Sequence, residues 1–240
     1  MNNYQQISQQ DKIALITGAG RGIGLAVANR FAPIYRLILV TKTEISATRL
    51  RKMFPTSYVY TVDLVQSTKV IDFVKQITKT VPHLDVLINN VGIYYAGAFE
   101  KTTLQELDDM YALHIKLPLL LIQKFLPLLK KSSQKQIINI SSAANIARLP
   151  TEGAYTATKA GLTALSDILQ LELQRYSIRI STIHPWTVNT KNFDHGEDFL
   201  QPEDIADIIE FIITRKKHCQ ILNVEASGSK DWRGAWPPWA

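Results

Sequence analysis

A cluster of glycines between residues 18 and 24 constrains the fold of this chain more than any other feature. Four of the eleven glycines fall there, directly after an apolar run at residues 13–16 and before helical apolar spacing at residues 23–31. An apolar run that does not alternate with polar residues is typical of a buried parallel strand. Glycines also mark ordinary tight turns. At a strand-to-helix turn, however, they let the main chain approach an anion, which the helix N-terminus attracts. The pattern therefore predicts a turn that binds dinucleotide phosphates.

The length and composition of the chain are those of one soluble globular domain. Its 240 residues suffice for one sizeable core, and 46% apolar and 20% charged residues are ordinary proportions. We expect a flexible, polar tail over residues 1–11 and a single dinucleotide-binding catalytic domain over residues 12–240. No apolar run approaches the ~18 residues that cross a bilayer, and the single cysteine, Cys219, cannot form an internal disulfide. We therefore expect a cytoplasmic protein without a membrane partner.

The net charge of +6 has two interpretations. A basic protein can bind nucleic acid or another acidic surface. The basic residues are dispersed, however, with modest clusters only at Lys130-Lys131 and Arg215-Lys216-Lys217, and no aromatic-interleaved basic segment accompanies them. Solvated helix ends explain this distribution better than a nucleic-acid site, and an anionic cofactor or substrate fits it as well.

Apolar runs of strand length alternate with segments of helical periodicity along the chain. We expect strands over residues 13–16, 36–40, 58–62, 85–88, 136–140, 178–183 and 220–224. We expect helices over residues 23–31, 44–54, 67–80, 104–112, 115–130, 154–176 and 202–214. This alternation predicts an α/β fold: a Rossmann-like, doubly wound sheet of seven mostly parallel strands with helices on both faces.

Polar residues and glycines stand where the predicted strands end. In a doubly wound sheet, ligands bind beyond the carboxyl ends of the strands, so these residues converge on one edge. They are residues 18–24, Thr41, Lys42, Asp63, Leu64, residues 89–92, Ser141, Ser142 and residues 184–190. The sequence therefore predicts the ligand site at this edge, whatever the ligand.

The pair Tyr155 and Lys159 is the sharpest chemical signal. Residues four apart share one face of a helix, so the ammonium group can lie near the phenol. A nearby cation lowers the pKa of a tyrosine from about 10 and makes it a usable general acid or base. Surface pairs of this kind are common. Here, however, Ser142 stands upstream at a strand end, where its hydroxyl could polarise a carbonyl group.

Together these motifs resemble the short-chain dehydrogenase/reductase family in its single-domain form. The resemblance covers residues 12–224 and rests on Thr17-Gly18-x-x-x-Gly22-x-Gly24, Asn89-Asn90-Val91-Gly92, Ser142, Tyr155-x-x-x-Lys159, and Pro185 with Thr190. It implies NAD(P)-dependent oxidoreduction of a carbonyl or alcohol. In the mechanism of the family, Tyr155 would protonate the substrate oxygen and Ser142 would orient it. Lys159 would bind the nicotinamide ribose and lower the pKa of Tyr155.

The resemblance also implies which residues bind the cofactor. Asp63 and Leu64 would contact the adenine, and Asn90 and Gly92 would flank the adenosine side. The full expected set is Thr17, Gly18, Gly20, Arg21, Gly22, Ile23, Gly24, Thr41, Lys42, Asp63, Leu64, Asn90, Val91, Gly92, Tyr155, Lys159, Pro185, Val188 and Thr190. No metal is expected.

The end of the second strand bears on the choice between NADP(H) and NAD(H). NAD-specific members place an acid there, which accepts from the ribose hydroxyls. This chain has Thr41 followed by Lys42, with Arg21 inside the glycine turn. Two cations would attract a 2′-phosphate, unless both are merely solvated. We therefore expect NADP(H) to be favoured over NAD(H).

His114 departs from the family pattern. It stands where the family usually has an asparagine, which holds a water in a proton relay to the active-site lysine. A histidine can donate and accept, so we include His114 among the catalytic candidates. Its ring could hold the same water, add a charge, or merely pack.

Trp186 is the second departure, because the family normally has Pro-Gly where this chain has Pro185-Trp186. The indole either narrows the pocket or packs outward. Further candidate walls of the substrate pocket are Tyr94, Tyr95 and Leu149. In the C-terminal tail, three tryptophans would cover a subunit interface or a pocket mouth, or pack on their own domain: Trp232, Trp236 and Trp239.

The sequence thus predicts an NADPH-dependent reductase that converts a carbonyl to an alcohol. The alternatives are an NAD-dependent alcohol dehydrogenase of the same family and a non-catalytic NADP(H)-binding sensor or scaffold. The joint presence of Ser142, Tyr155 and Lys159 speaks against a pure binding protein. The expected partners are a small-molecule carbonyl or alcohol substrate and, as in most family members, further copies of the chain in a homodimer or homotetramer. We expect no nucleic acid partner.

Overall fold

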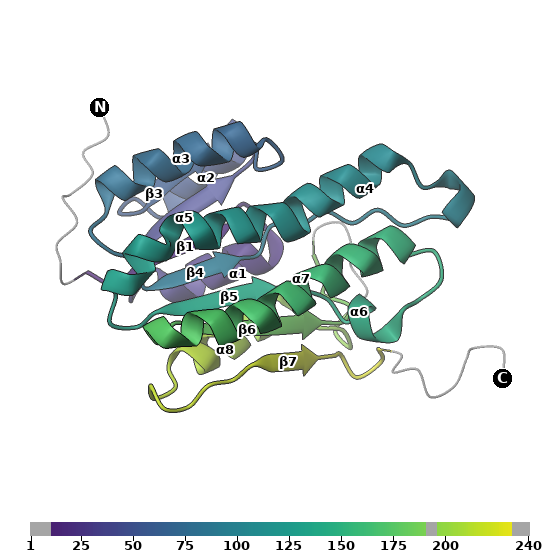
Figure 1. Cartoon of the computed structure of the whole chain (residues 1–240). Coiled ribbons are helices and arrows are strands. Elements are labelled where there is room, and N and C mark those ends of the chain that lie inside the picture. Colours follow the sequence, from purple (N-terminus) through teal and green to yellow (C-terminus); the bar gives the residue numbers. More distant parts are fainter. Residues whose placement is uncertain (1–10, 191–195, 232–240) are drawn as a thin grey trace.

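The computed structural model describes residues 11–190 and 196–231, which form a seven-stranded sheet with helices on both sides (Figure 1). The strand order is β3-β2-β1-β4-β5-β6-β7, and all neighbouring strands are parallel. The strands are β1 (Ile13–Thr17), β2 (Arg36–Thr41), β3 (Tyr58–Thr61), β4 (Val86–Asn89), β5 (Gln136–Ile140), β6 (Arg179–Pro185) and β7 (Asn223–Ala226). The predicted Rossmann-like α/β fold is confirmed.

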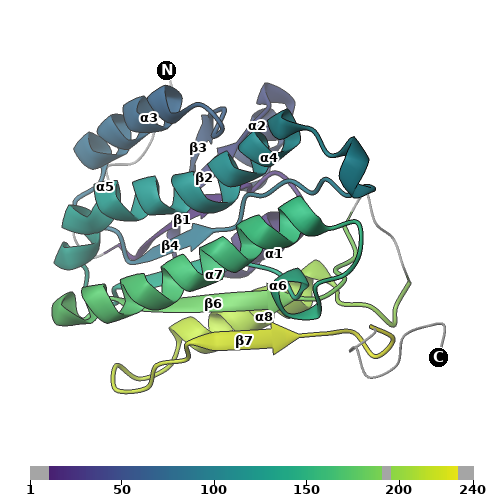
Figure 2. The ribbon, with the colours of Figure 1, turned by 45° about the vertical axis from the view of Figure 1, so that its right-hand side comes forward.

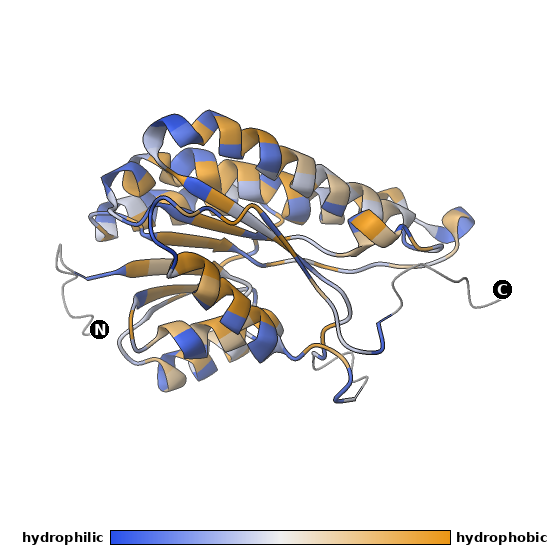
Figure 3. Ribbon diagram, turned by 90° about the horizontal axis from the view of Figure 1, so that it is seen from below, coloured by the Kyte–Doolittle hydropathy of each residue, from blue (hydrophilic) through white to orange (hydrophobic). Residues whose placement is uncertain are grey.

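Two layers of helices bury the two faces of the sheet. One layer consists of α1 (Gly22–Phe31), α2 (Glu44–Met53) and α8 (Pro202–Ile213), and the other of α3 (Ser67–Thr80), α5 (Leu117–Lys131) and α7 (Gly153–Leu173) (Figure 2). Successive side chains of a strand point to opposite faces. In β1, Ala14 and Ile16 join the core under α1 and α8, whereas Ile13 and Leu15 join the core under α3 and α5. Figure 3 shows the apolar strands between the two helical layers.

The helices predicted over residues 104–112 and 115–130 form one continuous helix, so the predicted break is wrong. α4 (Leu104–Tyr111) passes into α5 through a π-helical turn, η2 (Ala112–Lys116). The cause is Pro118, which has no N–H to donate to the carbonyl four residues earlier. The turn widens, and the N–H of Leu117 donates to the carbonyl of Ala112, five residues back.

The combined helix Leu104–Lys131 is long and apolar enough to cross a membrane by length and composition alone. Half of its most apolar part is buried inside the protein. Leu121, Phe125 and Leu128 of α5 lie in the core beneath the sheet. The apolar character of this helix therefore follows from its place in the core.

Smaller elements complete the fold and show where the prediction was inexact. β7, predicted at residues 220–224, lies at Asn223–Ala226, where it pairs with the end of β6. Two short helices were not predicted: η1 (Phe99–Lys101) and α6 (Ala144–Ala147). The helix predicted over residues 154–176 consists of α7 and η3 (Gln174–Tyr176), which continues it. Residues 1–10 of the predicted tail and the three C-terminal tryptophans lie outside the described residues.

The strand order reverses direction at β1, which has β2 on one side and β4 on the other. Ile16 pairs with Leu39 of β2 and with Ile88 of β4. In doubly wound sheets the crevice at such a switch point is where nucleotides bind. The glycine turn after β1 and the segment after β4 meet at this point.

Candidate active site

Thr17 ties the carboxyl ends of β1 and β4 together. Its buried hydroxyl donates to the carbonyl of Ile88 at 3.2 Å and accepts from the N–H groups of Asn90 and Val91 at 3.0 and 3.1 Å. The side-chain amide of Asn90 donates to the carbonyl of Thr17 at 2.8 Å. These bonds fix the glycine turn against the turn after β4, so Thr17 and Asn90 shape the crevice.

The turn between β1 and α1 requires glycine at specific positions. Gly18 and Gly22 have φ angles of 69° and 52°, in the left-handed region that glycine enters without strain. A Cβ placed on Gly24 would lie 2.4 Å from the carbonyl oxygen of Gly18. α1 begins at Gly22 without a side-chain cap, followed by Ile23. The N–H groups of its first turn, and the positive end of its dipole, therefore suit the phosphates of a dinucleotide.

Positive side chains gather beside the glycine turn. Arg21 and Lys42 are both exposed. Thr41 is buried beneath the turn, since a Cβ placed on Gly20 would lie 2.8 Å from its Oγ1. Arg49 of α2, which the sequence analysis missed, donates to the carbonyl of Gly20. The structure thus brings a third cation to the predicted 2′-phosphate side, and no motif in the sequence marked it.

The predicted adenine contacts lie after β3. The carboxylate of Asp63 accepts from the N–H of Val65 at 3.4 Å and from the side chain of Gln66 at 2.8 Å. The side chain of Leu64 is buried in the core. Leu64 therefore offers only its main chain to a cofactor.

The segment after β6 approaches the glycine turn from the opposite side. Pro185 is the buried last residue of β6, and Val188 forms an isolated bridge with Leu200. A Cβ placed on Gly22 would lie 3.2 Å from the methyl carbon of Thr190. The predicted cofactor residues of this segment therefore border the crevice.

Ser142, Tyr155 and Lys159 converge beyond the end of β5. The Nζ of Lys159 donates to the carbonyl of Ile140 at 2.9 Å and lies 5.8 Å from the centre of the Tyr155 ring. The hydroxyl of Ser142 lies close enough to the phenol of Tyr155 to lower its pKa. A Cβ placed on Gly92 would lie 3.6 Å from the Nζ of Lys159. The turn after β4 therefore closes over the same three side chains.

Burial controls the protonation of this group. It raises the pKa of Tyr155 to about 12. Ser142 lowers this pKa and the charge of Glu152 raises it further, but both effects are smaller than that of burial. Burial also lowers the pKa of Lys159 to about 7. The predicted lowering of the Tyr155 pKa is therefore wrong for this structure, because desolvation of the phenol is the largest influence on it.

His114 lies inside this cluster because the π-turn η2 directs it inward. It is buried, and its ring packs edge-on against Tyr155, with centroids 5.6 Å apart. The Nε2 accepts from the N–H of Ile93 at 3.3 Å, so the Nδ1 carries the proton and donates to the Oγ1 of Thr158 at 2.9 Å. Burial, and then the charge of Lys159, lower the pKa of His114 to about 2. The ring is neutral, which excludes the added charge considered from sequence.

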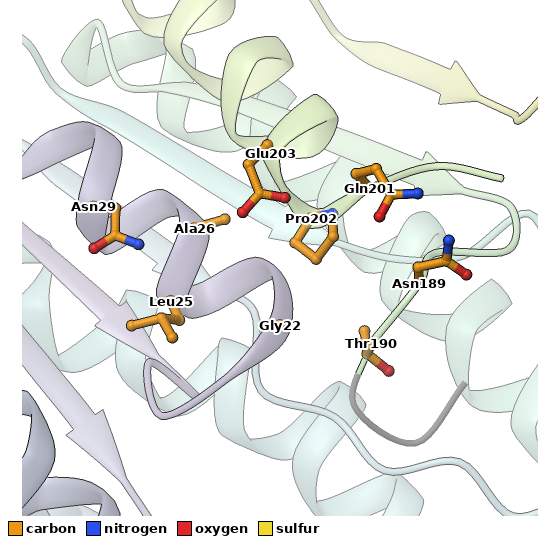
Figure 4. Close-up of a pocket in the computed structure, with 9 residues that line it drawn as sticks. All are labelled: Gly22, Leu25, Ala26, Asn29, Asn189, Thr190, Gln201, Pro202 and Glu203. Atoms are coloured by element: carbon orange, nitrogen blue, oxygen red, sulfur yellow. The ribbon is translucent and has the colours of Figure 1, made fainter. Parts of the chain in front are cut away.

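A separate cavity of about 330 Å³ lies between α1 and the start of α8 (Figure 4). Its lining residues are Gly22, Leu25, Ala26, Asn29, Asn189, Thr190, Gln201, Pro202 and Glu203. It meets the predicted cofactor site only at Gly22 and Thr190, and none of the catalytic candidates lines it. The catalytic candidates therefore lie at the crevice beyond β4 and β5, not at this cavity.

A family model described as short chain dehydrogenase matches residues 12–199. This chain belongs to the short-chain dehydrogenase/reductase family. An uncharacterized oxidoreductase of Staphylococcus epidermidis is 28% identical to the enzyme over 222 residues, covering 90% of this chain and 96% of that protein. A fatty acyl-CoA reductase of Acinetobacter baylyi is 30% identical over 218 residues, covering 85% and 74%. The enzyme is thus an oxidoreductase that binds a nicotinamide cofactor and acts on a small molecule.

Solved structures agree with this assignment. A metagenomic short-chain oxidoreductase in complex with NADP superposes with a TM-score of 0.78 at 27% identity, covering 89% of this chain and 96% of that one. A 3-ketoacyl-(acyl-carrier-protein) reductase from Brucella melitensis, complexed with NADH, has a TM-score of 0.81 at 24% identity, covering 91% and 97%. The second likeness shows the fold alone.

Trp186 of the enzyme is turned toward the edge strand of the sheet. Its Nε1 donates to a carboxylate oxygen of Glu225 in β7 at 2.6 Å, and its N–H donates to the carbonyl of Ala226 at 2.8 Å. Of the two alternatives left open by the sequence, outward packing is the one that these contacts favour.

The sequence analysis missed two residues at the site, Thr158 and Glu152, and the hydrogen bond of a third, Tyr94. Thr158 fixes the ring of His114, and the hydroxyl of Tyr94 donates to Glu152 at 2.6 Å beside Tyr155. Tyr94 was predicted only as a wall. Thr158 and Glu152 gave no signal of their own, although both lie within three positions of Tyr155 and one helical turn could have placed them near it.

Proposed function

We propose that the enzyme reduces a carbonyl to an alcohol with NADPH. The observation that carries this proposal is the convergence of Ser142, Tyr155 and Lys159 on one point beside the switch-point crevice. A protein that only bound a dinucleotide would need the glycine turn but not this group. The non-catalytic alternative is therefore disfavoured.

The side chains divide the reaction among them. A bound nicotinamide supplies the hydride that adds to the carbonyl carbon. The hydroxyl of Ser142 donates a hydrogen bond to the carbonyl oxygen, and the O–H bond of Tyr155 breaks as its proton passes to that oxygen, leaving a phenolate. Because its pKa is raised to about 12, Tyr155 is protonated at neutral pH, which is the form that reduction needs. Lys159 would hold the ribose hydroxyls of the cofactor.

His114 serves this reaction as a positioning residue. Both of its ring nitrogens are engaged by protein groups, Ile93 and Thr158. The neutral ring packs against Tyr155, where it limits the motion of the phenol. This role does not require the ring to hold the relay water of the family's asparagine.

The preference for NADP(H) over NAD(H) rests on charge. Arg21, Lys42 and Arg49 surround the glycine turn, and each would favour the doubly charged 2′-phosphate. Lys42→Glu should weaken NADPH binding by about tenfold or more, or about 1.4 kcal/mol, and leave NADH binding within about twofold. Lys69→Glu, at an exposed position of α3, is the control for net charge. An unchanged NADPH affinity in Lys42→Glu would contradict this assignment.

The catalytic role of Tyr155 is tested by Tyr155→Phe. The variant should lose about 10²-fold or more in NADPH oxidation with a panel of aldehydes and ketones, the scale of general acid catalysis, while its NADPH dissociation constant changes less than about twofold. Tyr111→Phe, an exposed tyrosine on α4, is the matched control. Undiminished turnover in Tyr155→Phe would overturn the mechanism.

We further propose a cytoplasmic homodimer or homotetramer. Ile168 and Leu171 of α7 are 55% and 69% exposed, and apolar side chains on a helix face favour association. Light scattering on the purified chain tests the assembly, and a monomer at micromolar concentration would contradict it.

A further inference from the structure

Two loops meet over Tyr155. One is residues 93–98, after the glycine that follows β4, and the other is residues 148–152, before α7. The N–H of Gly97 donates to the carbonyl of Thr151 at 2.9 Å, and the hydroxyl of Tyr94 donates to the Oε1 of Glu152 at 2.6 Å. The ring of Tyr94 also packs edge-on against Tyr155, with centroids 4.8 Å apart. Glu152 is thereby fixed next to the catalytic phenol.

The second loop is held in a strained conformation. Arg148 and Thr151 have φ angles of 52° and 68°, and a β-branched residue rarely enters this region. Such strain persists only where the surroundings enforce it. The two hydrogen bonds to residues 93–98 are contacts that hold the loop, and with it the carboxylate of Glu152, at the site.

The carboxylate of Glu152 has no ion-pair partner among residues 11–190 and 196–231. The hydroxyl of Tyr94 bonds one of its two oxygens. The negative charge of Glu152 acts on the catalytic group, because it raises the pKa of both Tyr94 and Tyr155. Its oxygens can therefore accept a hydrogen bond from a donor that enters beside Tyr155.

Apolar side chains stand near this charge. Tyr94, Tyr95 and Leu149 are 42%, 38% and 37% exposed, and all belong to the two loops or adjoin them. An entering molecule would meet apolar surface around one fixed negative charge.

We propose that Glu152, held by Tyr94, selects carbonyl substrates that carry an ammonium group next to the carbonyl and an apolar body, and disfavours anionic ones. This inference rests on the proposed reductase function. An ammonium group would donate to the second carboxylate oxygen while the carbonyl faces Tyr155. A substrate carboxylate at the same place would be repelled.

The test compares three ketones that share the benzoyl group and differ in charge. They are 2-amino-1-phenylethanone (cationic), 1-phenylpropan-1-one (neutral) and 3-oxo-3-phenylpropanoate (anionic). We expect kcat/KM to fall in that order, with the cation favoured over the neutral ketone by about tenfold or more, or about 1.4 kcal/mol. Glu152→Gln should reduce this ratio to near one. Glu152→Lys should favour the anion, and Glu100→Gln, an exposed acid in η1, should change nothing.

A binding measurement separates this proposal from the reductase function itself. Calorimetry on the enzyme with NADP⁺ should show 2-amino-1-phenylethanol binding at least about tenfold tighter than 1-phenylpropan-1-ol in the wild type, and equally in Glu152→Gln. If no ketone is reduced but this difference is found, the reductase function fails and the selection by Glu152 stands. If the ketones are reduced equally, or the two alcohols bind equally to the wild type, the selection by Glu152 is overturned.

Discussion

The hydrogen bond between His114 and Thr158 offers the sharpest test of how the site is held together. In Thr158→Val the hydroxyl is replaced by a methyl group of similar size. The Nδ1–H of His114, which is only 1% exposed and donates to Thr158 at 2.9 Å, then has no acceptor. A buried donor without a partner costs about 1–3 kcal/mol. The free energy of unfolding in urea should fall by that amount.

Thr156 provides a matched control two residues earlier on α7. Its buried hydroxyl has no hydrogen-bond partner in the part of the chain that the structure describes. Thr156→Val should therefore leave the free energy of unfolding unchanged within about 0.5 kcal/mol or raise it slightly. Equal unfolding midpoints for the two variants would refute the assignment of the Nδ1 proton and of its acceptor.

Three further predictions follow from burial and close packing. Burial lowers the pKa of His114 from 6.5 to about 2, so the unfolded chain binds one more proton than the folded chain between those pH values. The free energy of unfolding of the wild type should therefore fall by up to about 1.4 kcal/mol per pH unit below pH 6.5. In His114→Asn, urea unfolding should no longer show this pH dependence. Burial lowers the pKa of Lys159 from 10.5 to about 7, so the free-energy cost of burying this group should decrease as the pH rises between those values. Lys159→Met should therefore stabilise the protein more at pH 6 than at pH 10. Equal gains at the two pH values would contradict this. In Gly24→Ala the new Cβ would lie 2.4 Å from the carbonyl oxygen of Gly18. The variant should therefore lose about 1–3 kcal/mol of its free energy of unfolding in urea and should not bind the cofactor. Gly97→Ala, which has open space around the new Cβ, should show neither effect.

Most of the fold could be predicted because the central strands β1, β4, β5 and β6 are fully buried. Runs such as residues 13–16 and 36–40 are apolar without alternation, and the core on both sides of β1 explains why. The same reasoning failed at η2. A π-turn has no periodic signature of its own, and Pro118 marks a disturbance without saying whether the helix breaks or widens.

The candidate site was predictable where a residue acts through local geometry. The glycine turn and the spacing of Tyr155 and Lys159 can be identified in a single sequence. The pKa of Tyr155 was not, because its direction depends on how far Lys159 and the phenol are desolvated, which only the packed structure reveals. Contacts between segments that are distant in the sequence, such as the hydrogen bond from Tyr94 to Glu152, could not be predicted either.

The central claim is that the crevice binds NADPH in preference to NADH for a Tyr155-dependent reduction. Fluorescence titration of the purified enzyme with each cofactor tests it most directly. NADPH should bind about tenfold or more tightly than NADH, or about 1.4 kcal/mol, through the cations that flank the glycine turn. Tighter binding of NADH would contradict the cofactor assignment, and binding of neither would contradict the reductase function altogether.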